Sequence, residues 1–323
     1  SLSGETAGDS ELFGWSVSID SYGTLIAVGA PGEDSLNINT GSVYVLADEA
    51  KRFGTITTKA TNINTSSGSS IFINNREITF TTTNNPNELK TIIDAASISE
   101  VTTSVSGEYL TITSSNKSLN NKLSVRPGSG TDYESSSKLG LEPFRMIQKI
   151  DHPNGRDNEN FGLATKFDRY VSTSNNAEQT LVIASDKATT LLPTRFDVVN
   201  TLETTTFDAS STQFIENVNE SGAAYVYALL EPAGVASVTN SPLYAFGQQL
   251  QSTTIDQFDS FGCALGVYDN KVYVGSKNDD QYKTNGGSTY EFTNSKRNKV
   301  WSLVRSEDSK IDITSINRVI TYD

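Results

Sequence analysis

The sequence predicts a mainly β fold of about three propeller-type blades, whose ring is incomplete in this chain, with an inserted small α+β module. Three observations predict this. One pattern of short apolar runs and glycines occurs three times. The Phe-Gly pairs that open the copies begin at residues 13, 161 and 261, farther apart than the roughly 40–60 residues of one blade. The first gap also contains a helical pattern that the copies lack.

Each copy predicts three strands in a fixed order. In the first copy, residues 15–19 alternate between apolar and polar, residues 25–28 are continuously apolar, and residues 43–46 are β-branched or aromatic. A fourth strand is predicted after each copy, at residues 145–150, 243–250 and 299–305. Four antiparallel strands per repeat are typical of a propeller blade.

Glycines end the predicted strands, where the backbone turns or approaches another segment closely. We expect the recurring phenylalanines, glycines and one proline to be structural. These repeat positions are Phe13, Gly14, Gly29, Pro31, Gly41, Phe161, Gly162, Gly222, Phe261, Gly262, Gly275 and Gly287.

The sequence pattern of the copies resembles that of a known family. Phe-Gly, then Ala-Val-Gly-Ala-Pro, then Gly-Ser-Val-Tyr-Val resembles the FG-GAP repeat of integrin α-subunit propellers and of large phage virion and bacterial surface proteins. The second copy has Ala184-Ser185-Asp186 and the third Gly275-Ser276-Lys277 where the first has Gly29-Ala30-Pro31. The resemblance covers roughly residues 1–52, 144–231 and 241–306, and implies a propeller with an extracellular or surface location.

The spacing predicts five regions. Residues 1–53 form blade 1, residues 54–143 the inserted module, and residues 144–240 blade 2, with a long loop or hairpin on its rim at about 187–220. Residues 241–306 form blade 3. Residues 307–323 start a further inserted module or an edge strand, because their wording parallels residues 63–80.

The inserted module is predicted to be a ββαββ unit with one helix on one sheet. Residues 70–80 read as a hairpin that turns at Asn74-Asn75. Asn85 is expected to cap a helix that begins with Pro86 and runs to about residue 96. A second hairpin is expected from residues 101–105 and 109–113, and residues 123–125 close the unit.

Composition excludes several classes of function. The net charge of −13, with acidic residues spread along the chain, argues against a nucleic-acid partner. No apolar run approaches 18 residues, so no membrane insertion is expected. Abundant Ser, Thr and Asn with scarce Lys and His favour a virion or an extracellular or cell-surface location. The chain begins at Ser1 and its one methionine is Met146, so we expect a processed product or a piece of a longer chain.

No cofactor is predicted, with calcium as the candidate considered first. Integrin-type copies carry several carboxylates in one loop. Where a matching turn survives here, it retains one carboxylate, which in the first copy is Asp20. Asp157 and Asp259, each just before a Phe-Gly pair, are the other calcium candidates, and a shared turn in which the carboxylate accepts backbone N–H groups is favoured over a metal. One histidine and one cysteine supply neither a zinc site nor a catalytic triad, so no enzyme is predicted.

Aromatic residues near strand ends are expected mainly to fill gaps between blades. Tyr22 and Tyr282 are exceptions because they lie in predicted loops, and they are our candidates for binding a sugar or peptide. Both readings of such residues stay open at this point.

Together these observations predict a non-enzymatic structural or adhesion segment of a large virion protein, such as a phage tail or fibre, or of a cell-surface protein. It would work by blade stacking and by loop-mediated contacts with protein or glycan. Its expected partners are other copies or other segments of the same large protein, and a host surface glycan or protein. The alternatives are a secreted carbohydrate- or protein-binding propeller and, third, a glycan depolymerase.

Overall fold

The computed structural model describes most of the chain, and everything below concerns that part. The described residues are 11–58, 65, 67–83, 85–116, 122–128, 139, 141, 144–153, 155–168, 180–193, 214–218, 220–229, 244–251, 256–268, 271–280, 284, 286–294 and 301–305. They are mainly β, arranged in several antiparallel sheets, and no sheet within these ranges closes on itself. The mainly β prediction is therefore confirmed.

Three sheets have four strands each, in simple chain order. The first sheet contains β1 (Ser16–Ile19), β2 (Leu25–Ala30), β3 (Ser42–Ala47) and β10 (Arg145–Asp151). The second sheet contains β11 (Ala164–Phe167), β12 (Thr180–Ser185), β15 (Ala223–Leu229) and β16 (Tyr244–Leu250). The third sheet contains β17 (Phe261–Tyr268), β18 (Lys271–Ser276), β19 (Ser288–Asn294) and β20 (Trp301–Arg305). The fourth strand predicted after each copy is thus confirmed as β10, β16 and β20.

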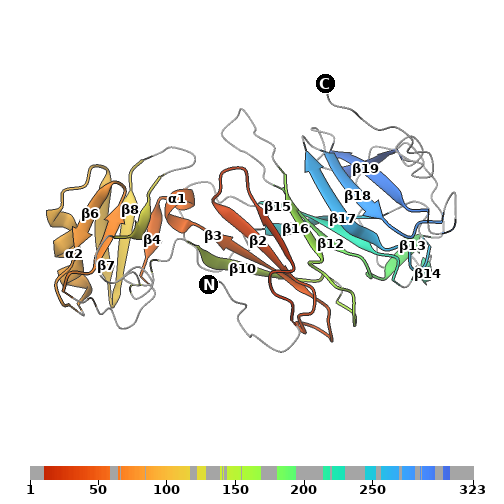
Figure 1. Ribbon diagram of the computed structural model, residues 1–323, viewed down its shortest axis with the longest axis horizontal. Helices are drawn as coiled ribbons and strands as arrows, with labels where there is room; N and C mark the ends of the chain where they lie inside the picture. The colour runs from red at the N-terminus through yellow and green to blue at the C-terminus, as the bar shows by residue number, and fades with distance from the viewer. Residues whose placement is uncertain are drawn as a thin grey trace, which may run out of the picture.

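The three sheets repeat the same register. Ser16 pairs with Gly29 in the first sheet, Ala164 with Ala184 in the second, and Ala264 with Gly275 in the third. The Phe-Gly pairs at residues 13, 161 and 261 consequently occupy equivalent places at the start of each sheet. Figure 1 shows the sheets following one another along the long axis of the molecule.

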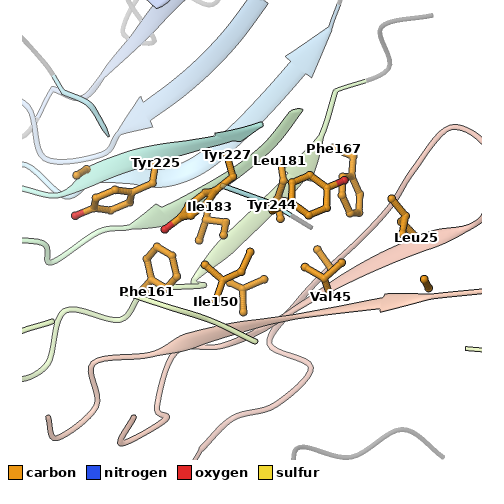
Figure 2. Packing of buried hydrophobic residues seen from close by; sticks show 14 of the residues in the cluster. Leu25, Val45, Ile150, Phe161, Phe167, Leu181, Ile183, Tyr225, Tyr227 and Tyr244 are labelled. Carbon is orange, nitrogen blue, oxygen red and sulfur yellow. The ribbon is translucent and has the colours of Figure 1, made fainter. Parts of the chain in front are cut away.

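Two apolar cores lie between consecutive sheets. The first core joins Leu25, Val45 and Ile150 of the first sheet to aromatic and branched residues of the second, as Figure 2 shows. The second core joins the other face of the second sheet, including Val182 and Val226, to the third sheet. The middle sheet is therefore buried on both faces, which explains the continuous apolar run of β12.

A separate unit occupies the chain between β3 and β10. It contains α1 (Glu49–Phe53), β4 (Thr55–Thr57), β5 (Ser70–Ile73), β6 (Arg76–Thr79), α2 (Pro86–Ala95), β7 (Val101–Ser106), β8 (Tyr109–Ser114) and β9 (Val125–Pro127). The predicted helix is confirmed as α2: Pro86 is in its first turn, and the Asn85 side chain accepts a hydrogen bond from the Asn87 N–H at 2.9 Å. Both predicted hairpins are confirmed as β5–β6 and β7–β8.

The prediction of a single sheet in this unit is wrong. Strand β4 joins β8, and strand β9 joins β5, so the unit has two three-stranded sheets in the orders β4-β8-β7 and β6-β5-β9. Each added strand has three residues, too few to display a period of two in the sequence. Both sheets share one core with Leu89 and Ile93 of α2.

The second long gap contains a pair of strands. β13 (Thr190–Pro193) and β14 (Phe214–Val218) are antiparallel partners, as expected for the hairpin alternative at residues 187–220. The region 307–323, for which a further module or edge strand is predicted, lies outside the described residues.

Candidate functional site

The backbones of consecutive sheets approach each other closely where a Phe-Gly pair meets glycine of the preceding sheet, and we call each such contact a Phe-Gly seam. In the first seam, the Phe161 N–H donates to the Thr40 carbonyl at 2.9 Å. A side chain on Gly41 would overlap the Phe161 backbone, and one on Gly29 would overlap the Gly162 carbonyl. Gly41 also has φ +87°, which L residues rarely adopt.

The second seam repeats the first. The Phe261 N–H donates to the Ser221 carbonyl, again at 2.9 Å. A side chain on Gly222, whose φ is +89°, would overlap the Phe261 backbone. The donor, the acceptor and the glycine therefore occupy equivalent positions in the two seams. Ala184 stands where the first sheet has Gly29.

Gly262 lies in the second seam, where a Cβ would come within 2.8 Å of the Ala223 carbonyl oxygen. The other repeat positions lie at the two ends of the stack. Phe13 and Gly14 begin the first sheet, and a Cβ on Gly14 would meet nothing. At the other end, Gly275 and Gly287 would contact only residues of their own sheet. Pro31 is buried in the turn that follows β2.

Each Phe of the repeat packs on a buried tyrosine of the third strand of its own sheet. The ring centroids are 5.2 Å apart for Phe13 and Tyr44, and 5.5 Å apart for Phe161 and Tyr225. Phe261 lies 5.4 Å from Tyr290 in the same way. These edge-on and tilted arrangements suit aromatic pairs, and they place three phenol hydroxyls in buried positions that require hydrogen-bond partners.

Carboxylates satisfy two of these hydroxyls. Tyr44 donates to Glu33 Oε2 at 2.7 Å, and Tyr290 donates to Asp279. Glu33 and Asp279 are equivalent, because their carbonyls accept the N–H of Gly41 and of Gly287 at 2.9 and 3.0 Å. Glu33 is also paired with Lys149 at 2.6 Å.

The second sheet uses a histidine instead. Its equivalent of Glu33 is Ala188, whose carbonyl accepts the Gly222 N–H at 2.9 Å. Tyr225 lies 2.9 Å from His152 Nε2, and His152 Nδ1 lies 3.2 Å from Glu159 Oε2. A neutral imidazole that carries its proton on Nδ1 satisfies both contacts.

Burial sets the protonation of this group. It lowers the pKa of His152 to about 4, so the imidazole is neutral at pH 7. Burial, together with the nearby Glu159 and Tyr227, raises the pKa of Tyr225 well above its usual value. The Tyr225 hydroxyl therefore stays protonated and donates to Nε2. His152 is also enclosed by Phe161 and Tyr225 rings at 5.2 and 5.0 Å, and its side chain is 1% exposed, so no substrate reaches it.

Acidic residues just before the Phe-Gly pairs have a structural role. Glu159 Oε2 accepts the Arg156 N–H at 2.9 Å, and Asp259 Oδ2 accepts the Asp256 N–H at 2.7 Å, three residues back in both cases. The predicted equivalence of Asp157 and Asp259 is wrong, because Glu159 stands two residues before its phenylalanine, as Asp259 does. Asp157 is exposed and accepts the Ile38 N–H at 3.2 Å.

The calcium candidates do not converge. Asp20 closes the turn between β1 and β2, where its Oδ1 accepts the N–H groups of Thr24 and Leu25 at 2.6 and 2.9 Å. Asp157 and Asp259 lie in other loops. Within the described ranges, no three His, Cys, Asp or Glu side chains form a group that could hold a metal ion.

The pair proposed for binding is placed only in part. Tyr22 lies in the turn between β1 and β2 and is partly exposed. Tyr282 lies outside the described residues.

Sequence reasoning missed the hydroxyl partners. A tyrosine three residues after the glycine that opens each third strand, as in Tyr44, Tyr225 and Tyr290, was the available signal.

The comparisons agree with the repeat. Residues 2–46 match the family model of the FG-GAP repeat, which confirms the resemblance found in the first copy. No curated protein matches the chain. Neither described helix has the length or the apolar character needed to cross a bilayer. FG-GAP repeats occur typically in extracellular or surface proteins and point to a β-propeller-type protein-binding or adhesion domain, and it is this repeat that opens the chain.

Proposed function

We propose that this chain is a non-enzymatic structural or adhesion segment of a large virion protein, such as a phage tail or fibre, or of a cell-surface protein. Its three four-stranded sheets would be FG-GAP blades, and the unit between β3 and β10 would be an inserted α+β module. The observation that carries the proposal is the Phe-Gly seam, which occurs twice with the same backbone contact at 2.9 Å.

The seams make the row of blades stiff. Glycines without room for a side chain bring the backbones of consecutive sheets together, and two apolar cores fill the space beside them. In the first seam, Ser16 Oγ donates to the Gly162 carbonyl at 2.8 Å, and the Phe167 N–H donates to Ser18 Oγ at 3.1 Å. Such a row can carry loops and modules at fixed spacing.

The inserted module is held firmly where it leaves the first sheet. Arg145 of β10 forms a 3.0 Å ion pair with Glu49 of α1, and both side chains are largely buried. Because removal of one partner from a buried pair is costly, this contact fixes α1 against the first sheet. In Figure 1 the unit between β3 and β10 extends away from the first sheet, so in this proposal its surface is open to a partner.

Immunogold labelling of native particles and cells from the source organism tests this role. Antibody raised against the purified chain should label a tail, a fibre or the cell surface at regular positions. Antibody that has been adsorbed with the purified chain is the control. Label confined to the soluble medium would reject the structural role and favour a secreted binder.

The binding alternative has its own test. Tyr22 is partly exposed in a turn, as a sugar-stacking residue must be. A glycan-array signal that is lost in the Tyr22→Ala and Tyr282→Ala variants, and retained when the exposed Tyr109 is replaced by alanine, would favour it.

A further inference from the structure

The two ends of the stack differ in polarity. At the first-sheet end, Trp15, which directly precedes β1, and Val17 and Ile19 of β1 alternate with the inward-facing residues, and they are 60%, 58% and 57% exposed. Tyr44 and Leu46 on the same face of the sheet are buried, and Ile26 and Met146 beside them are partly buried. These three large apolar side chains, on β1 and the residue before it, make an exposed apolar patch, which we call the β1 patch.

The β1 patch is equivalent to surfaces that are covered elsewhere in the molecule. Val17 pairs with Val28 as Leu265 pairs with Val274, so Val17 and Leu265 share one position. Ile19 corresponds in the same way to Phe167, which is buried against the first sheet. In both internal interfaces, the first strand of the following sheet lies against the first two strands of the preceding one.

The receiving faces of the first and second sheets are apolar. In the first sheet the cross-strand pair at the centre of this face is Ala27 with Val45, and in the second it is Val182 with Val226. Both pairs are buried in the cores between sheets. These small and branched residues accept the large side chains of the next sheet.

The third sheet has a polar receiving face. Its equivalent central pair is Tyr273 with Glu291. Lys271 is equivalent to Leu25 of the first sheet. It forms an ion pair with Glu291 at 2.7 Å. Covering this face would strip water from both charges, a cost that an apolar partner does not return. A polar outer face is typical of a terminal repeat.

We infer that the β1 patch is a docking surface for a further four-stranded sheet of the same repeat. The receiving face of the third sheet is a polar end to which a second copy of this chain does not bind. The occupant must offer an apolar receiving face with glycine or alanine where the first sheet has Gly29, and with glycine where it has Gly41. Within the part of the chain that the structure describes, such faces occur on the first and second sheets, and both are already covered. The inference rests on the proposed function in one respect, that the sheets act as stacking blades.

Replacing the polar end with the first sheet's residues tests both halves. The triple variant Lys271→Leu, Tyr273→Ala, Glu291→Val copies Leu25, Ala27 and Val45. In sedimentation velocity, the native chain should remain monomeric, and the triple variant should associate head to tail, with a weight-average mass at least about twice that of the monomer. Adding Val17→Asp and Ile19→Asp should restore the monomer.

A matched pair of substitutions controls for general solubility. Leu36 and Ile38 lie in the loop between β2 and β3, outside the β1 patch, and are about as exposed as Val17 and Ile19. Leu36→Asp with Ile38→Asp in the triple variant should leave association intact. Val17, Ile19, Leu36 and Ile38 are all largely exposed. Thermal unfolding should therefore show that replacing them with aspartate leaves the protein folded.

Fluorescence adds a direct readout of the patch. With Trp301→Phe, Trp15 is the one tryptophan left. Its emission should shift to shorter wavelength as the triple variant associates. A triple variant that stays monomeric, association without this shift, or association that survives Val17→Asp and Ile19→Asp would overturn the docking surface. Association of the native chain that Glu291→Lys abolishes would overturn the polar end. Immunogold results do not bear on any of these outcomes, so the two proposals fail separately.

Discussion

In the second repeat, the hydroxyl of the buried tyrosine has a different kind of hydrogen-bond partner from that in the first and third repeats. In the first and third sheets, a carboxylate of the same sheet accepts the hydroxyl of the buried tyrosine. In the second sheet, Tyr225 reaches His152, which directly follows β10 of the first sheet. The first two contacts lie within one sheet, whereas the third joins two sheets.

The comparison shows that the buried tyrosine requires a hydrogen-bond acceptor, and that the residue that supplies the acceptor can differ. A buried phenol hydroxyl without a partner is costly, so any acceptor within reach satisfies the repeat. Ala188 removes the carboxylate from the second repeat, and the imidazole compensates. The compensation also ties the second sheet to the first, which the carboxylates do not do.

Removing the imidazole should have the largest effect. His152→Ala leaves the Tyr225 hydroxyl and the Glu159 carboxylate without this partner and opens a cavity beside Phe161. We expect a loss of about 3–5 kcal/mol in the free energy of unfolding, measured by urea denaturation. The double variant His152→Leu with Tyr225→Phe should recover part of the loss, and a loss below about 1 kcal/mol for His152→Ala would contradict the role of the imidazole.

The histidine should also make stability depend on pH. Its pKa is about 4 in the folded protein and about 6.5 when unfolded, so the unfolded chain binds the proton first as the pH falls. The free energy of unfolding should therefore decrease by about 3 kcal/mol between pH 6.5 and pH 4, and this term should not grow further at lower pH. His152→Leu should lack the decrease, and an unchanged profile in that variant would assign the pH dependence to other groups.

The two kinds of acceptor should be distinguishable by removing the hydroxyl. Tyr44→Phe breaks a bond to a carboxylate and should cost about 2 kcal/mol, whereas Tyr225→Phe breaks a bond to a neutral imidazole and should cost about 1 kcal/mol. Thermal and urea unfolding of both variants, side by side, measures the difference. Equal costs would mean that the charge of Glu33 adds nothing.

A transplant should convert the second repeat to the other type. Ala188 stands where the first repeat has Glu33, and His152→Ala provides space for a longer side chain. Ala188→Glu in the His152→Ala background should regain about 1 kcal/mol by accepting the Tyr225 hydroxyl. The same substitution in the native chain should destabilise it, because Ala188 is fully buried. A transplant that lowers stability in both backgrounds would show that the positions are not interchangeable.

A pH effect of the other sign concerns Asp259, the third-repeat equivalent of Glu159. Burial, and then the neighbouring Asp279, Asp256 and Asp280, raise the pKa of Asp259 to about 6. Its folded state holds the proton more tightly than the unfolded chain, so stability should fall as the pH rises from about 3.8 to about 6, opposite in sign to His152. Asp259→Asn keeps an acceptor for the Asp256 N–H and should flatten this slope. A slope that persists in the variant would point to another carboxyl.

Periodicity made most of the strands predictable. The glycines and apolar runs of β2, β12 and β18 mark the repeat, and the cap at Asn85 marks α2, because these signals depend on residues close together in the chain. The short strands β4 and β9 escaped prediction, since each exists by pairing with a distant hairpin.

The hydroxyl partners were not predictable in the same way. His152 and Tyr225 are 73 residues apart and meet because two sheets stack. Glu159 was passed over for Asp157, whose carboxylate lies nearer to the Pro/Gly turn but on the exposed side of the loop. Contacts between sheets depend on the stacking geometry, which a single sequence pattern does not encode.

The manner in which the unit between β3 and β10 joins the first sheet has a consequence for how such proteins diversify. Ala47 and Arg145 are cross-strand partners, so the chain departs and returns at points about 5 Å apart. Such a junction suits a folded unit with adjacent termini, and the glycines of the Phe-Gly seams lie elsewhere in the sheets. A lineage that carries this row of sheets could thus alter what it displays while its framework stays the same.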